Sequence, residues 1–223
     1  MEIQLYGILL LLHVLLFAYW LGADLGVFYG AKFAADGRYS IETRQTIGRI
    51  MAFVDLAPRL SVPLVGATGI SMGAISGALD LRGIWVWAVW LAALLWVASN
   101  LYIYRHRAEP DRVQPVIRFD LWWRASLMVV AAAVAVASLL GAGITANVAL
   151  AVKLLILATA IALSLLLRAL FRPYRPALRR IAAGADNAAE SAIMAAALAR
   201  ARPVVIAIWM AVIAAAAIGL WAL

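Results

Sequence analysis

The chain has 223 residues, of which 67% are hydrophobic and 13% are charged. Soluble domains are about 45–50% apolar and about 25% charged, so this composition excludes an ordinary soluble domain. The formal net charge of +8 is typical of basic loops beside anionic lipid, and we expect no nucleic-acid partner. The absence of cysteine excludes disulfides and thiolate metal sites.

Long continuous apolar runs predict an all-α fold, a polytopic transmembrane helical bundle, because about 20 apolar residues span a bilayer as a helix. In chain order we expect six spans, over residues 4–31, 49–78, 84–104, 121–142, 147–170 and 203–223. Pro58 and Pro63 weaken the start of the second span, whereas Pro203 suits the first turn of the sixth. We interpret the whole chain, 1–223, as one domain in contact with the lipid bilayer.

The connectors predict the orientation of the spans. Arginine is frequent in and around the first, third and fifth connectors, whereas the second has only Asp80 and Arg82 and the fourth, GAGITAN, has no charge. The positive-inside rule then places both termini on the non-cytoplasmic side of the bacterial cytoplasmic (inner) membrane. The alanine-rich segment at about 176–200 predicts a helix along the cytoplasmic surface, more typical of a spacer than of a partner-binding helix.

The first span, LLLLHVLLFAYWLGADLGVFYG, carries two ionisable side chains where hydrocarbon is expected. Helical spacing places on one stripe His13, Phe17, Trp20 and Asp24. A roughly opposite face carries Gly22, Gly26 and Gly30. A central charge costs about 2.5–3.5 kcal/mol in lipid, and small residues let helices approach closely. Both faces are therefore predicted to contact protein.

Charged and amide side chains predict a buried polar network towards the cytoplasmic ends of the spans. Its expected members are Asp24, Asp55, Arg59, Asn100 and Arg124. Asp55 and Arg59 are four residues apart, a spacing that allows an ion pair along one helix. We expect Asp24 to pair with Arg59. A structural ion pair and a role in substrate or proton binding are alternative hypotheses for this network.

His13 is the candidate metal ligand, because imidazole commonly binds haem and metals; the alternative is a hydrogen bond across helices. His106 lies in the basic third connector, far from His13 in depth, which excludes a bis-histidine haem within one chain. A single-histidine haem, a site pairing His13 with Met72 or Met128, and a site completed by another subunit remain. Lys153 enters near the outer end of the fifth span, where it either binds a carboxylate near His13 or reaches the surface.

The order of these features resembles a known superfamily. The matching segments are LHVLLFAYWLG, RQTIGRIMAFVDLAPRLSVPLVGATGI and VKLLILATAIALSLLLR. They are similar to the copper-resistance D membrane domain and the membrane protoporphyrinogen oxidase of bacterial haem synthesis, and most similar to integral-membrane relatives of unknown function. The matching positions are His13, Trp20, Gly22, Arg59, Thr68, Gly69, Lys153 and Leu154, within residues 5–75 and 120–170.

This resemblance implies a haem- or porphyrin-associated redox protein with haem b as its cofactor. His13 would be the ligand, and Arg59 and Lys153 would contact the propionates through charge-assisted hydrogen bonds. One alternative is a transporter or proton-coupled permease that uses the intramembrane His13, Asp24, Asp55 and Arg59. Another is a membrane anchor in a larger complex, either a homo-oligomer or bound to a partner membrane subunit. The sequence identifies no catalytic residue, since P-loop, GxSxG and HExxH motifs are absent.

Overall fold

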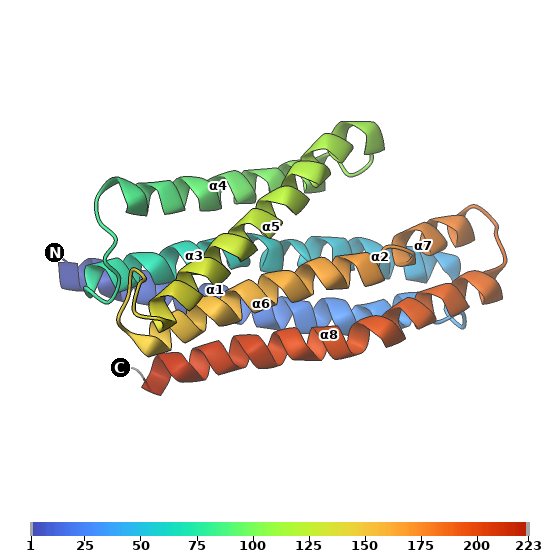
Figure 1. Cartoon of the computed structure of the whole chain (residues 1–223). Coiled ribbons are helices and arrows are strands. Elements are labelled where there is room, and N and C mark those ends of the chain that lie inside the picture. The colour runs from blue at the N-terminus through green and yellow to red at the C-terminus, as the bar shows by residue number, and fades with distance from the viewer. Residues whose placement is uncertain (1, 222–223) are drawn as a thin grey trace.

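The computed structural model describes residues 2–221, which form eight helices and no strand (Figure 1). The helices are α1 (Glu2–Ala35), α2 (Ile41–Val54), α3 (Leu56–Ile75), α4 (Ile84–Arg105), α5 (Pro110–Leu139), α6 (Val148–Leu170), α7 (Tyr174–Ala182) and α8 (Asn187–Trp221). The predicted all-α fold is confirmed. The last two residues of the sixth predicted span lie outside the described residues.

Six helical units are long and apolar enough to cross a membrane, with α2–α3 and α6–α7 each counted as one unit. Large apolar side chains face outwards on these units, for example Leu11 at 61%, Trp87 at 75% and Val129 at 59% exposure. Outward apolar side chains are expected where lipid covers the surface. The fold is therefore compatible with a multi-pass integral membrane protein, as predicted.

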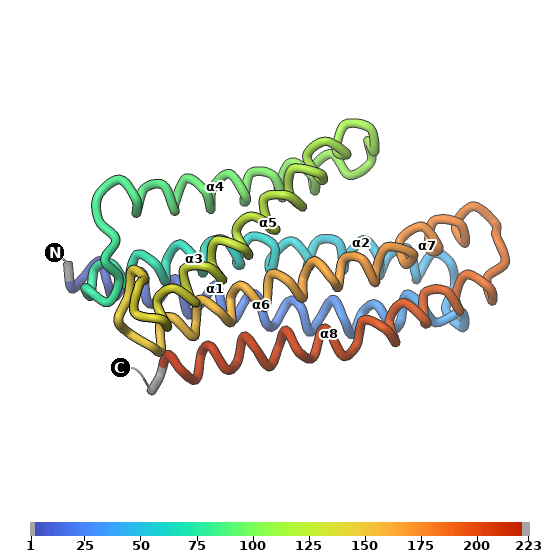
Figure 2. Tube along the Cα trace, viewed as in Figure 1, coloured from blue at the N-terminus to red at the C-terminus, as the bar shows by residue number. Residues whose placement is uncertain are grey.

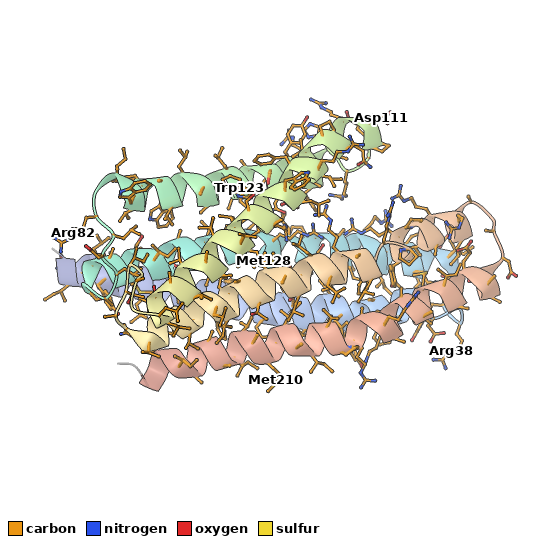
Figure 3. All side chains as sticks on the ribbon, viewed as in Figure 1. Arg38, Arg82, Asp111, Trp123, Met128 and Met210 are labelled. Carbon is orange, nitrogen blue, oxygen red and sulfur yellow. The ribbon has the colours of Figure 1, made fainter. Side chains whose placement is uncertain are left out.

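The membrane-spanning helices form a closed ring in chain order. Each packs against the next, from α1 to α3, α4, α5, α6 and α8, and α8 returns to α1. Because the number of spans is even, both ends of the chain lie at the same end of the ring (Figures 1 and 2). The opposite end carries the connectors 36–40, 106–109 and 183–186, and we call it the basic end. Figure 3 places Arg38 and Asp111 there and Arg82 at the other end.

At the basic end the helices continue into a tightly packed extension. It comprises the end of α1, all of α2 and α7, and the first part of α8. Alanine lets these helices pack closely, and Ala34, Ala177 and Ala197 are fully buried. The Tyr174 hydroxyl donates to the Ala31 carbonyl over 2.6 Å. With 34 residues, α1 is about 50 Å long against a hydrocarbon core of about 30 Å, so it is long enough to extend beyond that core.

Two features differ from the sequence-based expectations. The second predicted span is divided at Asp55 into α2 and α3. Pro58 explains the division, because it has no N–H to donate to the Val54 carbonyl. The predicted surface helix at 176–200 is replaced by the short α7 and by the start of a continuous α8, which contains Pro203 in its interior. Met194 and Ala201 of α8 are fully buried, so this segment packs into the extension.

Candidate functional site

His13 faces the interior of the ring, as predicted. Its Nδ1 lies 3.0 Å from the Thr68 hydroxyl oxygen on α3. That hydroxyl also lies 2.8 Å from the Leu64 carbonyl and 3.1 Å from the Val65 carbonyl, so it can donate to the backbone and accept from His13. In the tautomer that carries its proton on Nδ1, the His13 Nε2 has a lone pair for a ligand. A Cβ on Gly69 would lie 3.1 Å from His13 Cε1, so the glycine makes room for the ring.

The rest of the first-span prediction holds in part. Trp20, on the same stripe as His13, is 8% exposed. On the glycine face, a Cβ at Gly30 would lie 3.0 Å from Met51 Cγ, whereas one at Gly22 would have no neighbour within 4 Å. The glycine face therefore packs against α2 near the basic end and is open further along.

Lys153 lies on the same side of the ring as His13. A Cβ on Gly219 would be 2.9 Å from the Lys153 ammonium nitrogen, which therefore lies against the backbone of α8. Lys153 is also within electrostatic range of His13. Arg59 is nine residues before Thr68 on α3, about 13 Å away towards the basic end. The structure thus brings together two of the three predicted cofactor-binding residues and separates the third.

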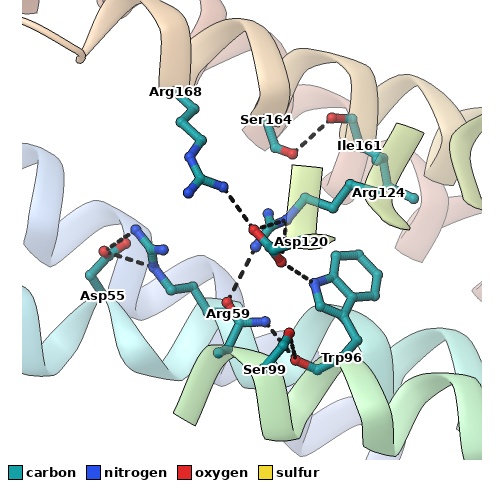
Figure 4. A network of polar contacts seen from close by, with 10 residues as sticks. Asp55, Arg59, Trp96, Ser99, Asp120, Arg124, Ile161, Ser164 and Arg168 are labelled. Atoms are coloured by element: carbon teal, nitrogen blue, oxygen red, sulfur yellow. Dashed lines mark hydrogen bonds and ion pairs between the residues drawn. The ribbon is translucent and has the colours of Figure 1, made fainter. Parts of the chain in front are cut away.

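A second polar centre surrounds Asp120 on α5, a residue that is fully buried. Its carboxylate accepts from Arg168 Nη1 at 2.7 Å, from Arg124 Nε at 3.1 Å and from Trp96 Nε1 at 3.0 Å. Arg124 also donates to the Asn100 side-chain oxygen over 3.3 Å. Figure 4 shows how α4, α5 and α6 each contribute to this centre. We call Asp120 and these four partners the Asp120 cluster.

An adjacent ion pair occupies the break between α2 and α3. Arg59 donates to Asp55 over 2.9 and 2.6 Å, and Arg175 of α7 approaches the same carboxylate oxygen at 3.5 Å. The predicted Asp55–Arg59 pair is confirmed. The expected Asp24–Arg59 pair is wrong, because Arg59 binds the carboxylate one turn before it on its own chain segment. Asp24 lies within electrostatic range of both residues.

These groups form one electropositive site, which we call the arginine site and define by Asp55, Asp120, Arg59, Arg124, Arg168 and Arg175. Four guanidinium groups share two carboxylates, which leaves two positive charges in surplus, and nearby Asp24 offsets one of them. Within residues 2–221, no acceptor binds Arg59 Nη1, Arg124 Nη1 or Arg168 Nη2. The Arg59 and Arg168 side chains are 33% and 31% exposed, so their free N–H groups are accessible. Chemically, the site can bind an anion.

The predicted polar network is assembled in part. Asn100 and Arg124 meet as expected, and Asp55 meets Arg59. Sequence reasoning missed both Asp120, which falls in the third predicted connector, and Arg168, which lies at the end of the fifth predicted span and was counted with the arginines flanking the next connector. Two signals in the sequence could have identified them. Asp120 is four residues before Arg124, and Arg168 lies near the end of an apolar run.

The described residues contain no group of three or more histidine, cysteine, aspartate or glutamate side chains that could hold a metal ion. Comparison with protein-family models, with curated proteins and with solved structures finds no match. The functional argument therefore depends on the chemistry of the sites themselves.

Proposed function

We propose that the protein binds an anionic substrate at the arginine site and belongs to the transporter class. The observation that supports this function is the shortage of carboxylates: four guanidinium groups, three from the ring helices and one from α7, share Asp55 and Asp120. Unbalanced charge is costly in a membrane domain, and a bound anion would remove that cost. Arginine matches phosphate and carboxylate groups through paired N–H donors.

The helix break beside the site supports a transporter. Transporter sites often use discontinuous helices, whose exposed N-termini favour anions. Asp55 separates α2 from α3, and Arg59 lies in the first turn of α3. The division between the two helices therefore lies at the arginine site.

Anion binding is tested by thermal unfolding of the purified full-length protein with inorganic phosphate or pyrophosphate, against chloride at constant ionic strength. At a concentration a hundredfold above Kd, the bound anion should stabilise the fold by about 2.7 kcal/mol. Arg168→Gln should remove most of this gain, whereas Arg82→Gln, at a side chain 91% exposed at the other end of the ring, should not. The proposal is wrong if both variants respond to phosphate and pyrophosphate as the wild type does.

We propose haem or porphyrin association as a second candidate, because a His13 imidazole that donates from Nδ1 to Thr68 can bind iron through Nε2. Haem would supply redox chemistry when bound there. The two propionates of haem extend from the same edge of the porphyrin. Arg59 and Lys153 lie on opposite sides of His13 along the bundle, so they cannot both contact propionates. His13 would therefore hold the haem, and Lys153 rather than Arg59 would contact a propionate.

Absorbance spectra test this second candidate. Protein purified from its native membrane, with and without added haemin, should show a Soret band that His13→Ala abolishes and His106→Ala retains. A wild-type spectrum without the band in both preparations would exclude it.

A further inference from the structure

An apolar cavity of about 240 Å³ lies inside the ring, among α3, α4, α5 and α6. These helices also supply Arg59 and the whole Asp120 cluster. The cavity begins at Val62 and Leu127, three residues beyond Arg59 and Arg124, and extends to Leu79 and Ile144 near the opposite end. It therefore runs along the ring axis, away from the arginine site.

Trp96 contacts both the cavity and the charged groups of the Asp120 cluster. Its indole ring lines the cavity, while its Nε1 donates to Asp120. The Arg124 guanidinium lies 5.1 Å from the centre of the same indole ring. Trp96 alone thus separates the apolar cavity from the cationic groups. A molecule with an apolar chain in the cavity would therefore place its head group at the arginines.

The cavity is suited to a chain from the surrounding bilayer. An engineered apolar cavity of about 150 Å³ binds benzene, so the larger volume here accommodates part of an acyl or prenyl chain. Val130 lines the cavity and is 57% exposed, which places this stretch of wall at the boundary between protein and lipid. A lipid can therefore reach the cavity without crossing water.

We infer that the arginine site and this cavity together bind a phosphate-headed membrane lipid, with one chain in the cavity and the phosphate at Arg59, Arg124 and Arg168. This inference rests on the proposed anion-binding function and names its substrate class. A phosphate monoester carries about −1.5 to −2 charges at pH 7, enough to balance the positive charge that the carboxylates leave in surplus. A zwitterionic head group leaves that surplus in place.

Native mass spectrometry of the full-length protein with added phosphatidic acid tests the inference. Phosphatidic acid should bind about tenfold tighter than phosphatidylcholine or a fatty acid of the same chain length. Arg168→Gln should weaken its binding by about tenfold. Ala131→Phe, which fills the cavity from α5, should do the same, whereas Ala133→Phe, on the exposed face of the same helix, should leave binding unchanged.

A phosphatidic acid with a diazirine in its acyl chain provides a measurement on the wild type, in case Ala131→Phe does not fold. The label should attach to cavity residues such as Leu127 and Val134. Attachment confined to the outer face of α4 around Trp87, or equal binding of the fatty acid, would overturn the inference.

The two proposals fail differently. If phosphate and pyrophosphate stabilise the fold through Arg168 while chain length and Ala131→Phe have no effect, the anion site stands and the lipid assignment is wrong. If Arg168→Gln changes the binding of neither soluble anion nor lipid, both proposals are wrong.

Discussion

Buried arginines occur in two regions of this molecule, and their surroundings differ. In the basic-end extension, Arg44 of α2 is fully buried, and none of its hydrogen-bond partners among residues 2–221 is a carboxylate. Its guanidinium donates to the Ala34 carbonyl at the end of α1 over 2.7 Å, and to Asn187, Ser191 and Met194 on α8. Neutral oxygen and sulfur atoms thus surround the cation, and the negative end of the α1 dipole favours its charge.

The arginine site has the opposite character. Its guanidinium groups share carboxylates, remain partly exposed and keep N–H groups that the described residues leave unpaired. An arginine such as Arg44, whose three nitrogens all donate to protein atoms, fixes helices together. Arginines with a nitrogen that donates to no protein atom can bind a ligand. Burial and positive charge do not distinguish the two regions, because both contain them. The regions differ in whether the arginine nitrogens have protein acceptors, and this difference separates a structural role from a binding role.

The largest expected effect is at Arg44. In Arg44→Met, the buried Ala34 carbonyl loses its donor, at about 1–3 kcal/mol for a buried polar group left unpaired. The hydrogen bonds that join α2 to Asn187 and Ser191 of α8 are lost as well. We expect a total loss of about 3–5 kcal/mol in the free energy of unfolding, measured by denaturant unfolding in detergent. Arg49→Met, at an exposed position on the same helix, is the control. We also expect phosphate to stabilise the folded Arg44→Met protein as much as it stabilises the wild type. Loss of this stabilisation would mean that Arg44 contributes to anion binding as well as to structure.

Asp120→Asn should sharpen the comparison. Asparagine keeps an acceptor for the Trp96 indole but removes the charge that Arg124 and Arg168 bind, so stability should fall by about 2–3 kcal/mol. The surplus positive charge rises at the same time, so the stabilisation by phosphate or pyrophosphate should increase. Unfolding midpoints with and without each anion measure both effects. Weaker binding of both anions would show that Asp120 contributes to the site by orienting the arginines.

Gly69→Ala tests whether His13 behaves like Arg44, as a packed and fully positioned side chain. The added methyl would meet His13 Cε1 at 3.1 Å, whereas Gly66→Ala would meet Leu157 at an ordinary 3.9 Å. Alanine is favoured over glycine in a helix by about 0.5–1 kcal/mol, so Gly66→Ala should stabilise the protein. Gly69→Ala should instead destabilise it by about 1 kcal/mol through overpacking. Equal unfolding midpoints would mean that the imidazole moves freely.

The sequence predicts the spans and the local pairs well, because both depend on short-range periodicity. Asp55 and Arg59 could be paired from their spacing alone. Arg168 lies within the fifth predicted span but was counted with the arginines flanking the next connector. Asp120 was missed because the spans were bounded by their apolar runs, whereas α5 begins at Pro110. Depth inferred from hydropathy thus placed Asp120 in a connector. Arg44 was counted as a loop charge for the same reason, since nothing local indicates that α8 folds over it.

The smallest expected effect is at the tip of the basic-end extension, where Asp36 is partly exposed and its partner Arg38 is 87% exposed. The Asp36 carboxylate accepts from the Arg38 Nε and Nη2 groups, at 3.0 and 2.6 Å, and from the Arg38 backbone N–H at 3.0 Å. The Arg38 guanidinium lowers the pKa of Asp36 from 3.8 to about 2. A depressed carboxyl pKa contributes stability above its unfolded value, and that contribution is lost as the pH falls through the folded value.

Stability should therefore decline slightly between about pH 4 and pH 2 through this group, and Asp36→Asn should remove that part of the decline. Unfolding midpoints across this range, compared with those of Asp80→Asn at the opposite end, measure the difference. The Asp36–Arg38 pair is in water, where ion pairs contribute little. A large effect of Asp36→Asn would mean that this loop anchors α1 to α2, and that the extension depends on its surface charges as well as on Arg44.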